Sequence, residues 1–231
     1  TNTYKDIEAK AEMIGYPLII KPANLGSSIG IEIVHKKDEL KSALSECAKY
    51  DDKLVIEKMV KQLKEVNISV MGNSKDAKVS AIEEVMKGDE FLSFSNKYLG
   101  GGKGTKGSKP TKVAPTKGSK GMASASRIVP ARLDGNQKEQ IEEYALKSFK
   151  ALNASGAVRI DFMIDKEDGS VYVNEINSIP GSLAFYLWKE VGVDFREECD
   201  LLINNALNVY REKKKKVRSF DTNILSNYKE N

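Results

Sequence analysis

The sequence of 231 residues is poor in cysteine and histidine and has no long apolar segment. Two cysteines, Cys47 and Cys199, are too few for a scaffold stabilised by disulfides. The apolar segment at residues 16–20 ends at Lys21, well short of the ~18 residues of a membrane helix. A charged and then apolar export signal is also missing from the first residues. These features predict a cytoplasmic protein that has no membrane as a partner.

The net charge of +4 comes from one short segment and a basic C-terminal tail. Residues 99–121 contain six lysines and no acidic residue, and without these six the 37 basic residues fall to 31, against 33 acidic ones. A nucleic-acid-binding surface needs Lys and Arg spread along a helix or groove. Because the rest of the chain is nearly neutral, the sequence does not predict nucleic acid as a partner.

Apolar periodicity predicts an α+β fold with antiparallel hairpins. Alternating apolar residues favour strands at residues 17–21, 31–35, 53–58, 65–71, 77–85, 157–164 and 170–176. Helical spacing favours helices at 38–50, where Cys47 is expected in the core, at 134–153, and from Asp194 onward. On the last helix the apolar side chains are expected to face inward; they are Phe195, Cys199, Leu202, Ile203, Ala206 and Val209.

Residues 99–121 are predicted to form a flexible loop. They contain seven glycines, and the sequence TKGSK occurs twice, at 105–109 and at 116–120. A segment of this composition buries too little apolar surface to order itself.

The strongest candidate site lies on the hairpin of the strands at 157–164 and 170–176. Alternation places Arg159 and Asp161 on one face of the first strand, and Glu175 and Asn177 on one face of its partner. Two carboxylates close together need a compensating cation, and oxygen ligands of this kind suit Mg²⁺. The alternative is a surface ladder of ion pairs between the strands. The apolar residues that alternate with these four favour the metal site.

A second candidate site is the loop at residues 26–30, between the first two strands. Its backbone N–H groups and the hydroxyls of Ser27 and Ser28 can cradle phosphate oxygens. Lys21, at the end of the preceding strand, can add a positive charge. The spacing differs from that of a Walker loop, and a loop that only turns the chain is the alternative.

Taken together, these segments resemble the ATP-grasp superfamily and, within it, the D-alanine–D-alanine ligases. The matching segments, in the family's order, are YPLIIKPANLGSSIG (16–30), VIEKMV (55–60) with Glu65, NKYLGGG (96–102) and GAVRIDFMID…VYVNEINSIPG (156–181). The resemblance implies an ATP-grasp fold, in which two α+β subdomains with antiparallel sheets grip ATP between them. Residues 1–60 would form the lid subdomain, 61–212 the catalytic subdomain with the loop 99–121, and 213–231 a basic tail.

The resemblance also implies roles at the nucleotide, with the loop 99–121 as a mobile lid. Nucleotide contacts are implied for Lys21 and Lys97 at the phosphates, Gly26, Ser27 and Ser28 over the phosphates, Glu57, Lys58 and Val60 at the adenine, and Glu65 at the ribose.

At the reacting centre, the resemblance implies that Arg159 steadies an acyl phosphate and that the N–H of Gly181 joins an oxyanion site. Tyr98 would pair with Ser27 across the closed site. Asp161, Glu175 and Asn177 match the family's Mg²⁺ ligands, which implies two Mg²⁺ ions, with Mn²⁺ as an alternative.

The implied activity is ATP-dependent ligation of a carboxylate to an amine, as in peptidoglycan precursor synthesis. The γ-phosphoryl group would pass to the carboxylate, and the amine of a second substrate would attack the resulting acyl phosphate. The implied substrates are small-molecule amino acids. A homodimer is implied through the family's N-terminal domain, which is absent from this sequence.

Two alternatives stay open at this stage. One is an ATP-grasp ligase for a different amino acid or peptide, because the segment 182–188 is shorter and bulkier than the acceptor loop of the ligases. The other is a nucleotide-binding module without catalysis, against which the retained Arg159 argues. We interpret Phe185, Tyr186 and Trp188 as core residues rather than substrate contacts.

Overall fold

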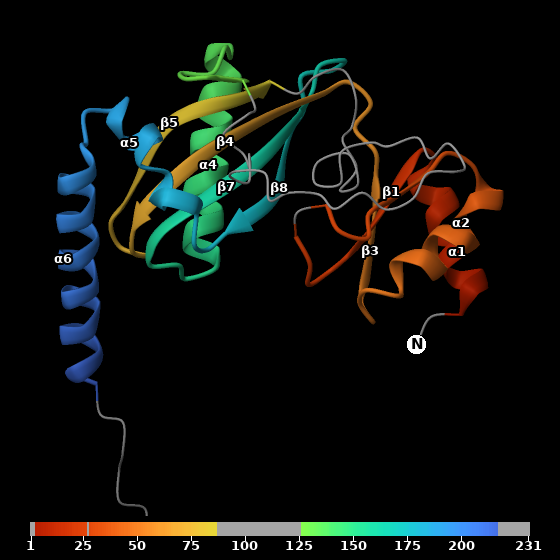
Figure 1. Cartoon of the computed structure of the whole chain (residues 1–231), viewed down its shortest axis with the longest axis horizontal. Coiled ribbons are helices and arrows are strands. Elements are labelled where there is room, and N and C mark those ends of the chain that lie inside the picture. The colour runs from red at the N-terminus through yellow and green to blue at the C-terminus, as the bar shows by residue number, and fades with distance from the viewer. Residues whose placement is uncertain (1–2, 27, 87–125, 217–231) are drawn as a thin grey trace, which may run out of the picture. The chain divides into compact units, whose positions relative to one another are not determined.

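The computed structural model describes residues 3–26, 28–86 and 126–216, which fall into two compact units (Figure 1). One unit comprises residues 1–62 with 87–126, and the other comprises 63–86 with 127–231. The predicted flexible loop at 99–121 lies outside the described residues.

The first unit is a three-stranded antiparallel sheet with two helices. The strands are β1 (Leu18–Pro22), β2 (Glu32–Val34) and β3 (Leu54–Lys58), in the order β2-β1-β3. The helices are α1 (Tyr4–Ile14) and α2 (Lys37–Cys47). The core between them is formed by Ala11, Leu18, Ile20, Val34, Leu40, Ala43 and Cys47. The prediction that Cys47 is a core residue is confirmed, and its thiol donates to the carbonyl oxygen of Gly30 at 3.0 Å.

Helix α1 was not predicted, although its start carries a recognisable signal in the sequence. Thr3 Oγ1 accepts from the backbone N–H of Asp6 at 3.3 Å, and the Asp6 carboxylate accepts from the Thr3 N–H at 3.0 Å. This reciprocal pair is a capping box, which satisfies two backbone donors at a helix start.

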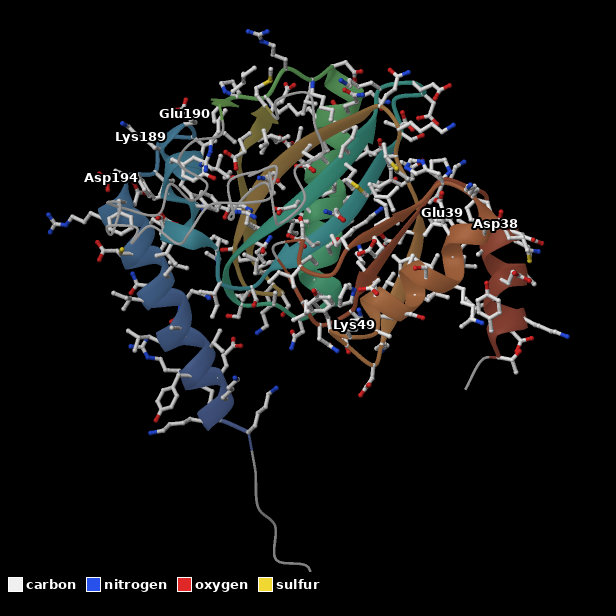
Figure 2. The ribbon with its side chains drawn as sticks, turned by 45° about the vertical axis from the view of Figure 1, so that its right-hand side comes forward. Asp38, Glu39, Lys49, Lys189, Glu190 and Asp194 are labelled. Atoms are coloured by element: carbon white, nitrogen blue, oxygen red, sulfur yellow. The ribbon has the colours of Figure 1, made fainter. Side chains whose placement is uncertain are left out.

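Helix α2 ends at Cys47, three residues before the predicted end. Figure 2 shows Asp38 and Glu39 at the start of α2 and Lys49 just beyond its end. Acidic side chains at the first turn and a basic one past the last turn both suit the helix dipole.

The second unit is built on a five-stranded antiparallel sheet in the order β6-β5-β4-β7-β8. Its strands are β4 (Leu63–Gly72), β5 (Ala77–Met86), β6 (Ser126–Ile128), β7 (Gly156–Asp165) and β8 (Val171–Asn177). Helix α4 (Gly135–Ala151) packs against one face of this sheet (Figure 1). The predicted strands and the α+β class are confirmed.

The two faces of the second sheet differ in character because side chains alternate along each strand. On β7 the residues that face α4 are apolar, as Ile160 and Phe162 show, whereas Arg159 and Asp161 point to the other face. The apolar face and α4 together form the core, with Val66, Ile68, Val70, Ile82, Ile141, Ala145, Phe149, Val158, Ile160, Phe162, Ile164 and Val171. The opposite face is therefore free to carry polar side chains.

Two short helices, also missed by the sequence analysis, lead from the sheet to the last helix. They are the 3-10 helix η2 (Gly181–Ala184) and α5 (Phe185–Lys189), and α6 (Phe195–Lys214) follows. Figure 2 labels Lys189, Glu190 and Asp194 at the turn between α5 and α6. Trp188 on α5 is buried, and its Nε1–H donates to Ser69 Oγ at 3.1 Å. Ser69 lies opposite Arg159, so α5 covers part of the polar sheet face.

The prediction for the apolar face of α6 is wrong in part: Cys199, Leu202 and Val209 are half-buried, but the other three residues are exposed. Phe195 is 53% exposed and Ile203 is 57% exposed, and Ala206 is exposed as well. The one fully buried side chain of this helix is Glu198. None of the helices in the described ranges is both long and apolar enough to span a membrane.

Burial of Glu198 predicts a pH-dependent stability. Both carboxylate oxygens lack a hydrogen-bond partner among the described residues, and burial raises the pKa of this carboxyl from an ordinary 4.5 to about 7. Below pH 4.5 the group is protonated in both states. As the pH rises to 7 the unfolded chain ionises first, so the free energy of unfolding falls, by up to about 3 kcal/mol.

Replacing Glu198 by Gln should remove this pH dependence. We expect the difference in unfolding free energy between E198Q and the parent chain to grow between pH 5 and pH 8, measured by urea denaturation at each pH. The control is E197Q, at an exposed neighbouring position. Parallel pH curves for E198Q and the parent chain would contradict the expectation.

Candidate functional site

The hairpin of β7 and β8 brings four predicted site residues together. Antiparallel pairing sets Arg159 opposite Asn177 and Asp161 opposite Glu175. Directly opposite residues share one sheet face, so all four side chains lie on the polar face. The alternation in the sequence predicts this arrangement, and the register establishes it.

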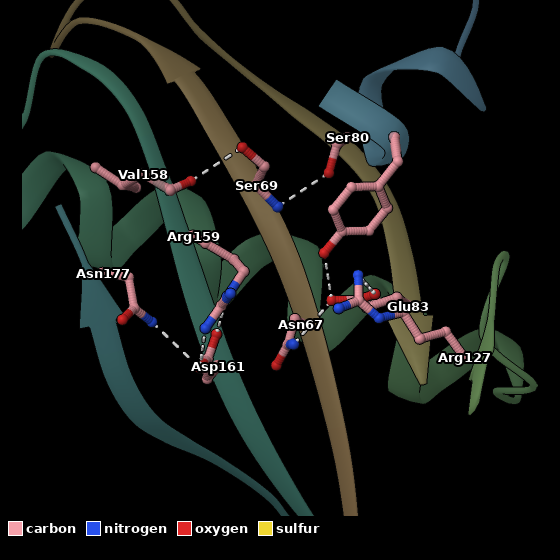
Figure 3. Close-up of polar contacts among 10 residues, drawn as sticks. Asn67, Ser69, Ser80, Glu83, Arg127, Val158, Arg159, Asp161 and Asn177 are labelled. Carbon is pink, nitrogen blue, oxygen red and sulfur yellow. Dashed lines mark hydrogen bonds and ion pairs between the residues drawn. The ribbon is translucent and has the colours of Figure 1, made fainter. Parts of the chain in front are cut away.

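Arg159 and Asp161 form a two-point ion pair. Arg159 Nε donates to Asp161 Oδ1 at 2.7 Å, and Arg159 Nη2 donates to Oδ2 at 2.8 Å. Asn177 Nδ2 also donates to Asp161 Oδ2, at 3.1 Å (Figure 3). The hydrogen bonds to Asp161 raise the pKa of Arg159. The guanidinium is therefore held as a fixed positive charge on the sheet face.

Glu175 lies on the edge strand β8 and keeps an exposed side. Its partial burial, and then the neighbouring Asp161 carboxylate, raise the pKa of Glu175. Arg159 acts in the opposite direction. A further cation at this position would relieve the repulsion between the two carboxylates.

The polar residues continue as a row across four strands. Glu83 on β5 pairs with Asn67 on β4. Asn67 pairs on its other side with Asp161 on β7, and Asp161 pairs with Glu175 on β8. Asn67 Nδ2 donates to Glu83 Oε1 at 2.9 Å within this row (Figure 3). We call these four residues the polar row.

Glu83 is buried in a second polar cluster next to the hairpin. Tyr186 Oη donates to Glu83 Oε1 at 2.7 Å, and Arg127 Nη1 lies 3.7 Å from Glu83 Oε2. The Arg127 guanidinium also stacks over the Tyr186 ring, 5.0 Å from its centroid. Burial, and then the hydrogen bond to Glu83, raise the pKa of Tyr186.

The sequence analysis did not select Glu83, Asn67 or Arg127 and assigned Tyr186 to the core. The available signal was alternation, since Asn67 stands between Val66 and Ile68 in a strand. Trp188 is a core residue as predicted, but Phe185 is exposed, and Tyr186 is only partly buried and joins the polar cluster.

Gly181 opens an unusual turn beside this cluster. Ser182, Leu183 and Ala184 have φ values of 53°, 56° and 60°, in the left-handed region. Each such residue costs about 1–2 kcal/mol when it is not glycine. Three in succession require anchors on the C-terminal side, which Tyr186 and Trp188 supply through their hydrogen bonds to the sheet.

The first unit carries the predicted phosphate and adenine residues. Lys21 Nζ lies 2.7 Å from Glu57 Oε2, between strands β1 and β3. Lys58 ends β3, and Val60 follows in the connection to β4. This juxtaposition of Lys21 with Glu57 was not predicted.

The remaining predicted residues are scattered. Gly26 and Ser28 lie in one turn, closed by a hydrogen bond from the Ile29 N–H to the Gly26 carbonyl at 3.2 Å. Ser28 has a φ of 59°. Glu65 lies on β4 opposite Met163, on the same face as Asn67. Ser27, Lys97 and Tyr98 lie outside the described residues.

The donor chemistry of the hairpin fits a magnesium ion. Within the described residues, no group of three or more His, Cys, Asp and Glu side chains is placed to hold a metal. Asp161 and Glu175 nevertheless offer two carboxylates, and Asn177 adds an amide oxygen. Hard oxygen donors with a limited charge suit Mg²⁺, which keeps several waters and uses substrate phosphates as further ligands.

Comparison with known proteins identifies the family. The family model described as "D-ala D-ala ligase C-terminus" matches residues 1–204. The chain belongs to this family. The D-alanine--D-alanine ligases of Thermosipho africanus and Thermosipho melanesiensis are 39% and 41% identical to it over 214 and 212 residues, or 93% and 92% of the chain. Each alignment covers 52% of the relative, so the chain spans about half the length of these curated relatives.

Solved structures agree with this assignment. A VanG D-Ala:D-Ser ligase from Enterococcus faecalis has a TM-score of 0.64 at 27% identity, over 88% of this chain and 55% of that one. A D-alanine--D-alanine ligase from Bacillus anthracis, complexed with ATP, has a TM-score of 0.63 at 26% identity, over 92% and 58%. A Coxiella burnetii D-alanine-D-alanine ligase, at 23% identity over 93% and 51%, supports the fold with a TM-score of 0.69. The predicted family and ATP-grasp fold are therefore confirmed.

Proposed function

We propose that the chain is the nucleotide-binding and catalytic part of an ATP-dependent carboxylate–amine ligase, acting as a D-alanine–D-alanine ligase in peptidoglycan precursor synthesis. The observation that carries the proposal is the polar sheet face where Arg159, Asp161, Glu175 and Asn177 meet. A fixed guanidinium next to two carboxylates suits a reaction in which negative charge develops on phosphate and acyl oxygens. Family membership supports the same activity.

In the proposed reaction, the side chains of the site bind or neutralise charged groups of ATP and of the substrates. The first substrate's carboxylate attacks the γ-phosphorus of ATP to give an acyl phosphate and ADP. The second substrate's amine then attacks the acyl carbon, displaces phosphate and loses a proton. Arg159 stabilises the transferred phosphoryl group and the oxyanion of the second step, together with the Gly181 N–H. Lys21 and Lys97 neutralise the phosphates, Tyr98 pairs with Ser27 across the closed site, and Gly26 and Ser28 belong to the loop over the phosphates.

Asp161, Glu175 and Asn177 would hold the magnesium of the nucleotide. When bound, the ion neutralises charge on the β- and γ-phosphates. Glu57, Lys58 and Val60 would contact the adenine, and Glu65 the ribose. We also propose a cytoplasmic enzyme that takes small-molecule amino acids and dimerises through a further domain.

A second candidate is a ligase for another acceptor amino acid or peptide. Phe185 is 39% exposed and packs edge-on against Tyr186, with ring centroids 6.1 Å apart, in the segment that follows Gly181. Phosphate release by the full-length protein across a panel of D- and L-amino acids separates this candidate from the first, since release with D-alanine alone would support a D-alanine–D-alanine ligase.

The nucleotide part of the proposal can be tested on the chain alone. Millimolar ATP with Mg²⁺ should raise its melting temperature by mass action, and ATP with EDTA should raise it less. The variant Glu175→Gln should lose most of the magnesium-dependent part of the shift, because one of the two carboxylates is gone. Calorimetry that detects no magnesium-dependent ATP binding at millimolar nucleotide would refute the proposal.

A further inference from the structure

We propose that Glu83 is a positioning residue of the ligase: it fixes Tyr186 and Arg127 on the sheet face that carries Arg159. This inference rests on the function proposed above and adds a residue to it. Glu83 lies in the polar row, two strands away from Asp161. With strands ~4.8 Å apart, it acts through other side chains rather than by contact with the reacting atoms.

The burial of Glu83 is the first observation. The side chain is 1% exposed, and an ionised carboxylate in such a place is unfavourable unless charge and hydrogen bonds compensate it. Asn67 and Tyr186 both donate to Oε1, whereas Oε2 has no hydrogen bond among the described residues and faces Arg127 across 3.7 Å. The cluster therefore depends on the negative charge of Glu83.

The geometry around Tyr186 is the second observation. Its hydroxyl is held by Glu83 and its ring lies under the Arg127 guanidinium. Arg127 comes from β6, Glu83 from β5 and Tyr186 from α5, so a single carboxylate joins three elements. Tyr186 also lies two residues after Ala184, the last residue of the left-handed turn. Holding its hydroxyl holds the end of that turn.

The connection to the reacting centre is the third observation. Asn67, which donates to Glu83, lies opposite Asp161, and Asp161 holds the Arg159 guanidinium at 2.7 Å and 2.8 Å. Gly181, the candidate oxyanion donor, opens the turn whose other end is anchored by Tyr186. Glu83 thus sets the position of the segment that borders the substrate acyl group.

The test uses Glu83→Gln in the full-length protein. We expect kcat/KM for the amino-acid substrates to fall about 10- to 100-fold, which is ~1.4–2.7 kcal/mol, while KM for ATP stays within twofold. The matched control is Glu84→Gln. Glu84 is the next residue, forms an ion pair with Lys64 at 3.2 Å and belongs to the opposite sheet face, so its variant should behave like the parent enzyme.

A double-mutant cycle shows whether Glu83 acts through Tyr186. Tyr186→Phe keeps the ring over which Arg127 stacks and removes only the hydroxyl donor. The double variant should be close to the worse single variant, because Glu83→Gln removes the charge and Tyr186→Phe removes the donor of one and the same charge-assisted hydrogen bond. Hydrogen exchange of residues 181–188 should become faster in Glu83→Gln and stay unchanged in Glu84→Gln.

The possible results distinguish failure of the positioning role of Glu83 from failure of the ligase proposal. A full-length enzyme that releases phosphate normally with Glu83→Gln, or effects that add fully in the double variant, would overturn the positioning role and leave the ligase proposal standing. Equal increases in KM for ATP and in KM for the amino acids would also overturn the positioning role, since they would indicate a general structural defect. A parent enzyme that releases no phosphate with any amino acid would reject both proposals together.

Discussion

Glu175→Gln in the full-length protein is expected to lower kcat by 100-fold or more at saturating ATP. Glu175 stands opposite Asp161 on the hairpin, and a cation would relieve the repulsion between the two carboxylates. A neutral amide would weaken the hold on the metal where charge develops in the reaction. Steady-state kinetics with varied Mg²⁺ would show whether part of the loss returns at high metal concentration.

The contrast with Glu65→Gln makes this expectation specific. Glu65 lies on β4, opposite Met163 rather than opposite a carboxylate, and its proposed contact is the ribose. Its variant should mainly raise KM for ATP and leave kcat within a few-fold, because it removes binding that is equal in the ground and transition states. Glu167→Gln, in the exposed turn between β7 and β8, is the neutral control. Equal changes in both parameters for Glu175 and Glu65 would contradict the assignment.

The shared face of the site residues on β7 could be predicted because alternation along one strand is a local signal in the sequence. Alternation along β7 fixes which of its residues share a face, although the pairing of β7 with β8 contains an irregularity between Asp161 and Phe162. The sequence therefore predicts that Arg159 and Asp161 are neighbours on one face. The same holds for Cys47, whose helical spacing with Leu40 and Leu44 placed it in the core.

The role of Glu83 could not be predicted from local alternation, because its partners come from distant segments of the chain. Its partners Asn67, Arg127 and Tyr186 lie 16, 44 and 103 residues away. The pairing of β4 with β5 contains an irregularity between Ile68 and Val70, so the register over the full hairpin does not follow from its turn. Of two adjacent glutamates, the sequence does not say which one faces the polar side.

Helix α6 shows the limit of amphipathic patterns. Its apolar spacing predicts an inward face, yet Ile203 and Phe195 are exposed while Glu198 is buried. Apolar spacing along a helix marks one side of it as hydrophobic. Which side becomes buried, however, depends on the elements that pack beside the helix. The neighbouring elements are α5, β4 and β7, which meet the side of the helix that carries Glu198.

Gly72→Ala should cause the largest loss of stability in the second unit. Gly72 ends β4 with a φ of 136°, and a Cβ there would lie 2.0 Å from the carbonyl oxygen of Asp76. That oxygen already accepts the Asn73 N–H at 2.8 Å, so the turn between β4 and β5 cannot move away without losing this bond. We expect the free energy of unfolding to fall by at least about 3 kcal/mol.

The measurement uses the fluorescence of Trp188, the sole tryptophan of the chain, which is 2% exposed and belongs to the same unit. Urea denaturation should show a lower midpoint for Gly72→Ala. Gly135→Ala is the matched control, because it begins α4 and its added Cβ would meet no atom within 4 Å. That variant should be neutral or gain up to about 1 kcal/mol from helix propensity. An unchanged midpoint for Gly72→Ala would show that the turn between β4 and β5 rearranges at little cost, and the tight turn would then not determine the register of these central strands.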